Sequence, residues 1–252
     1  MKKSKIAARG LLCAAILGLA GIAQAEDKTE TIGSSQYLVH VPASYDGTQP
    51  FGVIVYIPGT KDKEKVLRAT PTDWVPVLEE RKLILISPHD AMNGVETSKR
   101  IALGMRGLEK MKSTKKIDSN RVYAAGLSGG ARIASAMGFT KPSVFKGTIQ
   151  SCGTDFPGAV RKDQAKPNER DHGQPYGILD GPATPAARSS VRFVLITGPK
   201  DFRYGNILDI YNGGFKKQNY KCLLIDDPKM GHQNCTGESL AKALDFIESK
   251  TP

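Results

Sequence analysis

The sequence predicts an α/β fold in which a mostly parallel central sheet has helices on both faces. Short apolar runs rich in Val, Ile and Leu recur along the chain, which is typical of strands buried on both faces. Segments with helical periodicity lie between these runs, which favours strand–helix–strand connections. The chain has 252 residues, 40% hydrophobic and 24% charged, and this composition excludes extensive disorder and a polytopic membrane protein.

The N-terminus has the features of a secretory signal peptide. An apolar stretch over residues 11–23 is followed by the small-x-small sequence Ala23-Gln24-Ala25, and four basic residues precede it: Lys2, Lys3, Lys5 and Arg9. The apolar stretch is shorter than the ~20 residues that a membrane-spanning helix needs. We therefore expect a bacterial signal peptide over residues 1–25, a secreted or periplasmic protein without a stable membrane anchor, and a single domain over residues 26–252.

The net charge does not indicate a nucleic-acid partner. The formal charge is +11, and removal of the four basic residues of the signal peptide lowers it to +7. The remaining lysines occur in short clusters over residues 61–65 and 110–116, whereas a nucleic-acid-binding protein concentrates its charge in one patch. We expect these clusters to be solvated loops and helix ends.

Seven strands are expected from the apolar runs. The turn-rich link over residues 42–50 predicts that the first two strands pair as an antiparallel hairpin at the edge of the sheet. The expected strands cover residues 36–41, 52–57, 82–87, 121–125, 145–150, 192–197 and 220–226.

Two apolar stripes at helical spacing indicate helices that pack on the sheet. They consist of Ile101, Met105, Leu108 and Met111, and of Leu240, Leu244 and Ile247. Residues 153–190 differ, because they contain five prolines and little periodicity between two strands. A long segment of this kind in a compact domain is often functional, so we expect a cap or a substrate-contacting loop.

The strongest chemical signal is the sequence Gly126-Leu127-Ser128-Gly129-Gly130. It follows an expected strand and precedes an expected helix that begins near Ala131. This strand–turn–helix context is that of a nucleophile elbow, in which small neighbours allow a strained turn that exposes the serine hydroxyl. The motif therefore predicts that Ser128 is a nucleophile.

A serine nucleophile needs a histidine base and a carboxylate that orients the histidine, in the chain order Ser, acid, His. Only His172 and His232 follow Ser128, and His232 comes directly after the last expected strand, at the sheet edge where ligands bind. Asp201 follows the preceding strand. We predict His232 as the base and Asp201 as the acid, with Asp155 as the competing acid.

The negative charge that develops in the reaction requires two preformed hydrogen-bond donors. The backbone N–H of Gly129 is expected to be one, because it directly follows the nucleophile. The loop Pro58-Gly59-Thr60-Lys61 follows an expected strand and should supply the other. Pro58 has no N–H, which leaves Gly59 or Thr60, and we favour Thr60.

With these residues assigned, the chain resembles the α/β-hydrolase superfamily, in particular the secreted esterases that include polyhydroxybutyrate depolymerases and feruloyl esterases. The resemblance is carried by the elbow, by the Asp201 and His232 loops, and by two segments on either side of the elbow, Asp118-Ser119-Asn120-Arg121-Val122-Tyr123 and Pro142-Ser143-Val144-Phe145. It implies the α/β-hydrolase fold, with Ser128, His232 and Asp201 as the triad. Such enzymes usually carry His-Gly at the oxyanion loop, where this chain has Pro58-Gly59.

Three cysteines remain after the signal peptide. Cys152 and Cys235 follow strand ends and should lie at the same edge of the sheet, whereas Cys222 begins its strand. An exported protein meets an oxidising compartment, so we predict a Cys152–Cys235 disulfide with Cys222 free. No Cys or His spacing indicates a metal site, and no cofactor is expected.

The sequence therefore predicts an enzyme that cleaves carboxylic esters, small or polymeric, through an acyl-enzyme. Two other functions remain open. The first is a catalytically inactive binding protein on the same scaffold, and the second is a peptidase or acyltransferase that uses the same triad.

Overall fold

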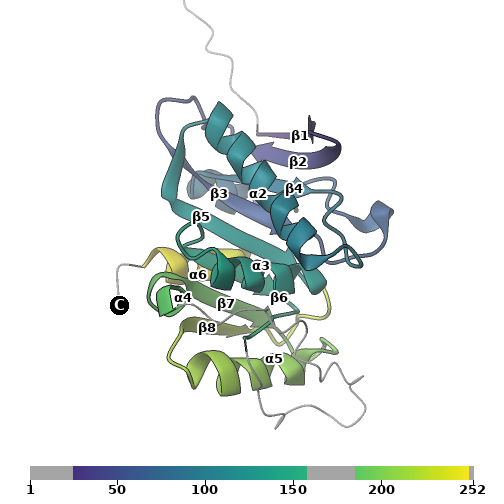
Figure 1. The fold of residues 1–252 in the computed structure, drawn as a ribbon, viewed down its shortest axis with the longest axis vertical. Helices are drawn as coiled ribbons and strands as arrows, with labels where there is room; N and C mark the ends of the chain where they lie inside the picture. Colours follow the sequence, from purple (N-terminus) through teal and green to yellow (C-terminus); the bar gives the residue numbers. More distant parts are fainter. Residues whose placement is uncertain (1–24, 158–184, 250–252) are drawn as a thin grey trace, which may run out of the picture.

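The computed structural model describes residues 25–157 and 185–249. They form an eight-stranded, mostly parallel sheet with helices on both faces, as predicted (Figure 1). The strands are β1 (Glu26–Ile32), β2 (Ser35–Val41), β3 (Phe51–Ile57), β4 (Leu83–Pro88), β5 (Ile117–Leu127), β6 (Gly147–Ser151), β7 (Arg192–Thr197) and β8 (Lys221–Asp226). The helices are α1 (Val75–Glu80), α2 (Thr97–Thr114), α3 (Gly129–Thr140), α4 (Pro185–Ser190), α5 (Tyr204–Ile210) and α6 (Gly237–Glu248), with short helical turns η1 (Lys63–Lys65) and η2 (Tyr211–Lys216).

The strand order across the sheet is β1-β2-β4-β3-β5-β6-β7-β8. Six neighbouring strands are parallel, in the order β4, β3, β5, β6, β7 and β8, and β1 and β2 are antiparallel at one edge. The predicted hairpin between β2 and β3 is wrong, because β2 pairs with β1 and β4. All seven residues of β3 are buried. A strand that is buried on both faces lies inside the sheet, and β3 is accordingly paired with β4 on one side and β5 on the other.

Strand β1 is not among the strands that the apolar runs predict. Its sequence, EDKTETI, contains a single large apolar residue, Ile32, so neither an apolar run nor alternation marks it as a strand. The strand forms because Gly33, at φ 65°, allows a tight turn that returns the chain as β2. The true hairpin therefore lies one strand earlier than predicted.

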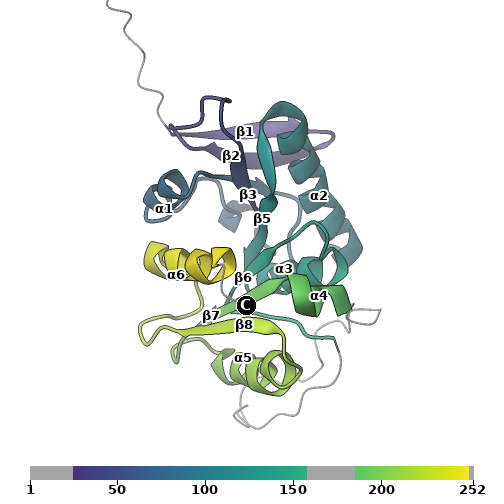
Figure 2. The same cartoon turned by 90° about the vertical axis from the view of Figure 1, so that its left-hand side faces the viewer.

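The helices pack on the sheet through the predicted apolar stripes. Figure 2 views the sheet nearly edge-on, with α1 and α6 on one face and α2 and α3 on the other. Leu240, Leu244 and Ile247 of α6 are buried in one core cluster, and Leu108 and Met111 of α2 are buried in the cluster on the opposite face. Because both faces are covered, the loops at the strand ends are the exposed places where a site can form.

Several predictions fall on residues outside the described ranges. They include the signal peptide up to residue 24, His172, and residues 158–184 of the expected cap. The described parts of the cap segment are residues 153–157, which lack regular structure, and α4 with the residues beside it. Within the described ranges, no helix combines the length and the hydropathy that a membrane span requires.

Candidate active site

Ser128 occupies a sharp turn between β5 and α3, as the motif predicted. Its backbone has φ 55° and ψ −118°, a conformation that residues other than glycine rarely adopt. The Ser128 N–H donates to the Ser151 carbonyl of β6 (2.8 Å), and the Ser128 carbonyl accepts from the Arg132 N–H (3.2 Å). Gly130 allows α3 to lie directly against β3, since a Cβ there would lie 1.9 Å from the Ile57 oxygen. These backbone contacts hold the serine in a strained turn, which is the geometry of a nucleophile elbow.

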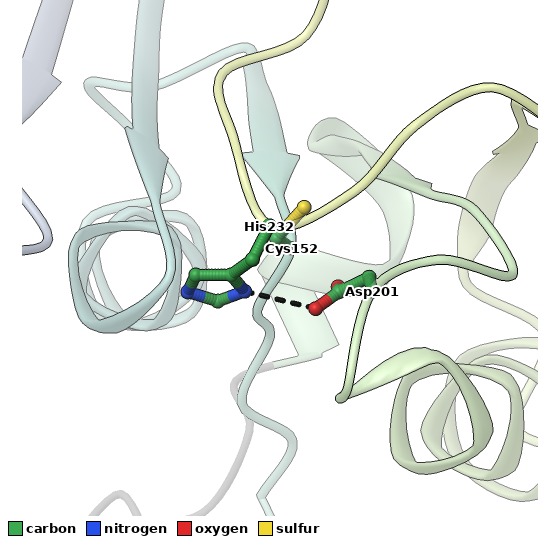
Figure 3. A group of neighbouring side chains, drawn as sticks. All are labelled: Cys152, Asp201 and His232. Atoms are coloured by element: carbon green, nitrogen blue, oxygen red, sulfur yellow. Dashed lines mark hydrogen bonds and ion pairs between the residues drawn. The ribbon is translucent and has the colours of Figure 1, made fainter.

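Asp201 and His232 are hydrogen-bonded to each other at the same edge of the sheet. Asp201 follows β7 and His232 follows β8, and the distance from Asp201 Oδ1 to His232 Nδ1 is 2.8 Å (Figure 3). The Asp201 side chain is fully buried, whereas that of His232 is 28% exposed. The second ring nitrogen, Nε2, points away from Asp201 and is available to exchange a proton with another group.

The surroundings of Asp201 favour its charged form. Burial alone would raise the pKa of this carboxyl, but the hydrogen bond from His232, the N–H of Arg203 and the charge on the imidazole outweigh burial and lower the pKa. The Thr197 hydroxyl also donates to the second carboxylate oxygen (3.1 Å). A buried carboxylate that stays ionised can fix the tautomer of His232 and stabilise its protonated form.

Ser128 lies at the same edge of the sheet as this pair, because β5, β7 and β8 are parallel strands of one sheet. Gly153, which follows Cys152, packs on the elbow so closely that a Cβ there would lie 2.3 Å from the Ser128 carbonyl oxygen. In the part of the chain that the structure describes, no hydrogen bond joins Ser128 to His232. Such catalytic hydrogen bonds often tighten only when substrate binds. The structure therefore joins two of the three predicted triad residues and places the third after β5, which is separated from β7 by β6 in the sheet.

Cys152 packs on the loop that carries His232. It follows β6 with φ 53°, and its Sγ lies 3.2 Å from the Gly231 carbonyl oxygen and 3.4 Å from that of Gln233. These two carbonyls flank His232, and the thiol also hydrogen-bonds to Asp201. Burial and the neighbouring Asp201 charge raise the pKa of the Cys152 thiol, so it stays protonated and acts as a donor.

Replacing Cys152 with alanine should loosen the His232 loop, because it removes a donor that faces the residues on both sides of the histidine. We expect kcat to fall about 3–10-fold, which corresponds to about one hydrogen bond, and Cys152→Ser to recover part of the loss. Steady-state kinetics on a soluble ester, the substrate class expected from the sequence, measures this. Cys222→Ala, on β8, is the control, and unchanged kcat in Cys152→Ala would contradict the expectation.

The structure contains Cys152, Cys222 and Cys235 as free cysteines, so it lacks the predicted Cys152–Cys235 disulfide. The two residues do lie at the same edge of the sheet, where the Cys235 N–H donates to Ser151 Oγ (3.3 Å). The Cys152 thiol, however, is engaged with the carbonyls of the His232 loop. Disulfide formation requires a specific orientation of both side chains, which placement at one edge does not provide.

The predicted oxyanion residues lie beside the elbow. Gly129 is the first residue of α3, and Gly59 packs against the elbow, since a Cβ there would lie 3.2 Å from the Ser128 Cβ. Thr60 follows Gly59, and its hydroxyl accepts from the Asp62 N–H (3.0 Å). The backbone of the loop after β3, rather than the Thr60 side chain, is therefore the part that can serve the site.

Asp155, the competing acid, belongs to a different environment. Arg132 forms an ion pair with it, with Arg132 Nε 3.7 Å from Asp155 Oδ1. Burial raises the pKa of Asp155 to about 8, although Arg132 and Arg203 act in the opposite direction. Since no hydrogen bond joins this carboxyl to a histidine among the described residues, Asp201 is the better placed of the two acids.

The raised pKa of Asp155 predicts a pH dependence of stability. The folded protein keeps this group protonated up to about pH 8, whereas the unfolded chain releases the proton near the ordinary pKa of 3.8. Its contribution to stability is therefore complete below about pH 4 and is lost as the pH rises towards 8. Asp155→Asn should raise the melting temperature at pH 8–9 by several degrees and leave it nearly unchanged at pH 4, as measured by thermal unfolding. An equal shift at both pH values would contradict this.

The other described histidines have structural partners. His40 Nδ1 bonds to Asp27 (2.8 Å) and His89 Nδ1 to Arg68 (3.1 Å). A cavity of about 530 Å³ lies beside the His232 loop, but Ser128, Asp201 and His232 do not line it. Neither feature contributes to the candidate site.

One group of potential metal ligands occurs in the described residues, and it consists of Cys152, Asp201 and His232, whose ligand atoms lie within 4.8 Å of one another (Figure 3). The thiol and the carboxylate are buried and already hydrogen-bonded to protein groups. The arrangement is that of a hydrogen-bonded His–Asp pair with a supporting thiol.

No family model and no curated protein matches the sequence. Solved structures do match the fold. A substrate-bound fluorophosphonate-binding serine hydrolase F from Staphylococcus aureus superposes with a TM-score of 0.62 at 16% identity, covering 88% of this chain and 97% of that one. A ferulic acid esterase from the anaerobic fungus Anaeromyces mucronatus gives 0.60 at 15% identity, covering 89% and 90%.

The chain has the α/β-hydrolase fold. The resemblance inferred from the elbow motif is thus confirmed for the architecture. A putative dipeptidyl aminopeptidase IV from Bacteroides ovatus also matches, with a TM-score of 0.60 at 14% identity, covering 87% of this chain and 35% of that one. Because proteins with the α/β-hydrolase fold include esterases and peptidases, the reaction must be argued from the site.

Proposed function

We propose that this protein is an exported serine hydrolase of carboxylic esters that acts through Ser128, His232 and Asp201. The observation that carries the proposal is the 2.8 Å hydrogen bond between Asp201 and His232, formed at the sheet edge that also carries a strained elbow serine. A histidine held by a buried, ionised carboxylate is the partner that a serine nucleophile requires.

In the first half of the proposed reaction, Ser128 Oγ attacks the ester carbonyl while His232 Nε2 accepts the hydroxyl proton. The imidazolium that forms is stabilised by Asp201 through the Nδ1–H bond. The carbonyl oxygen becomes negatively charged and accepts hydrogen bonds from the N–H of Gly129 and of Thr60. His232 then gives its proton to the departing alcohol, and the acyl group stays on Ser128.

In the second half, His232 accepts a proton from water, and the hydroxide attacks the acyl carbonyl. The tetrahedral intermediate collapses, His232 returns the proton to Ser128 Oγ, and the carboxylic acid leaves. Atoms and charges balance without a metal or a redox cofactor, so we propose none.

Ester substrates are favoured because the matched structure from Anaeromyces mucronatus is named as a ferulic acid esterase. The test is covalent labelling with a fluorophosphonate, followed by peptide mass spectrometry, together with a panel of short-acyl, long-acyl and feruloyl esters and dipeptidyl amides. We expect labelling at Ser128 and turnover of esters. A folded protein that is not labelled would instead support the inactive binding protein, and turnover of amides alone would support a peptidase.

The proposed export is tested separately. Expression of the full chain in a bacterium should give a protein in the periplasm or medium whose first residue is Glu26. Retention of residues 1–25 in the cytoplasm would refute this part of the proposal and would leave the esterase assignment standing.

A further inference from the structure

Three consecutive carbonyls of the loop after β3 accept hydrogen bonds from two residues, Asn93 and Arg100. Arg100 Nη2 donates to the Pro58 oxygen (2.8 Å) and Asn93 Nδ2 to the Gly59 oxygen (2.6 Å). The backbone N–H of Asn93 donates to the Thr60 oxygen (2.8 Å). We refer to Asn93 and Arg100 together as the carbonyl clamp.

The clamp fixes where the N–H groups of this loop point. All described peptide bonds are trans, and in a trans peptide the C=O and the following N–H point in opposite directions. The N–H of Thr60 therefore points away from Asn93, which holds the carbonyl of the same peptide. Among residues 25–157 and 185–249, neither the Thr60 N–H nor the Lys61 N–H has a hydrogen-bond acceptor, so both are free to bind a ligand.

The clamp also contacts the elbow. A Cβ at Gly129 would lie 2.0 Å from Asn93 Oδ1, so the Asn93 amide lies directly against the residue whose N–H is the other predicted donor. At Gly59, a Cβ would lie 1.7 Å from the Leu127 carbonyl oxygen. One side chain, Asn93, thus fixes the distance between the loop after β3 and the beginning of α3.

Arg100 connects this loop to its neighbour. Its Nε donates to the Ala91 oxygen (2.9 Å), in the loop after β4, while Nη2 bonds to Pro58. The arginine is 5% exposed and extends from the first turn of α2. Both loops are therefore tied to one rigid helix.

We propose that Asn93 and Arg100 are positioning residues that hold the Pro58–Thr60 loop so that the Thr60 N–H serves as the second oxyanion donor. The inference rests on the proposed function. It gives the role of oxyanion donor to a loop that begins with proline, at the position where the esterases that the sequence resembles usually have histidine. Neither residue touches the ester, because both act through the backbone of the loop.

The test compares Asn93→Ala with wild type and with Asn120→Ala, an exposed asparagine at the opposite end of β5. The concentration of active enzyme is determined by fluorophosphonate titration, so that inactive protein does not affect the result. We expect kcat per titrated site to fall about 10–100-fold in Asn93→Ala, less than for removal of an oxyanion donor itself, with KM changed by less than about threefold. Affinity for a trifluoromethyl ketone, whose adduct places an oxyanion in the hole, should fall by a similar factor.

Asn93→Asp is a second variant, whose side chain has the same shape as that of the wild-type asparagine. It keeps the oxygen near Gly129 but cannot donate to the Gly59 carbonyl, so it should lose at least as much activity as Asn93→Ala. If Asn93→Ala does not fold, Asn93→Asp and Arg100→Lys take its place, with the same expected loss of kcat per site. Normal kcat and normal ketone affinity in the folded variants would overturn the inference, whereas an inactive wild type would overturn the proposed function itself.

Discussion

Replacing Ser128 with alanine is expected to lower kcat for ester hydrolysis roughly 10⁴–10⁶-fold, because the acyl-enzyme cannot form without the hydroxyl. Fluorophosphonate labelling should be lost at the same time. The fold should remain, since the contacts that hold the turn are made by the backbone of residue 128, to Ser151 and Arg132. Activity assays and thermal unfolding of the same preparation measure both effects.

The matched control for this variant is Ser135→Ala. Ser135 is a fully buried serine of α3, the helix that begins directly after Ser128, and its hydroxyl donates to the Asp155 carbonyl oxygen (2.6 Å). Its loss should cost about 1 kcal/mol of stability and leave kcat within a few-fold of wild type. If Ser128→Ala retained wild-type turnover, another residue would have to be the nucleophile, and the proposed mechanism would be rejected.

Replacing Asp201 with asparagine should lower kcat about 10³–10⁴-fold. The amide matches the carboxylate in size, but it offers His232 a neutral partner and can hold the ring in the wrong tautomer. Because the wild-type carboxylate is buried with a lowered pKa, it is ionised throughout the working range, and raising the pH should not restore the variant.

Asp155→Asn is the matched control, since both aspartates are buried in loops that follow neighbouring strands. Its raised pKa means that near neutral pH the wild-type side chain is already largely protonated, so asparagine resembles it. We expect kcat within a few-fold of wild type. A large loss in Asp155→Asn together with an active Asp201→Asn would assign the acid to Asp155 instead.

The fold class and the grouping of the candidate residues follow from signals that the sequence carries locally. Fully apolar runs mark the central strands, and the glycines around Ser128 mark the elbow. Parallel strands then bring the residues that follow them to one edge, so Asp201 and His232 could be expected to meet although 31 residues separate them. Their catalytic roles stay predictions.

Features that depend on the detailed path of the backbone could not be predicted. Strand β1 has no apolar pattern. The pairing of β2 with β4 depends on which strands lie between two others in the sheet, and the apolar runs do not indicate this order. The Cys152–Cys235 prediction was made from edge placement, which does not define where a thiol points. Asn93 and Arg100 act on main-chain carbonyls, and such contacts leave no residue pattern in a single sequence.

The position of β8 affects how the protein would lose the proposed activity. Among residues 25–157 and 185–249, this strand is the last in the sheet and pairs only with β7, and its side chains are only partly buried. Edge elements with few buried contacts open locally at a lower free-energy cost than the central strands. Since His232 is carried by the loop after β8, heat inactivation should begin as a local opening, at temperatures where the central sheet is still intact.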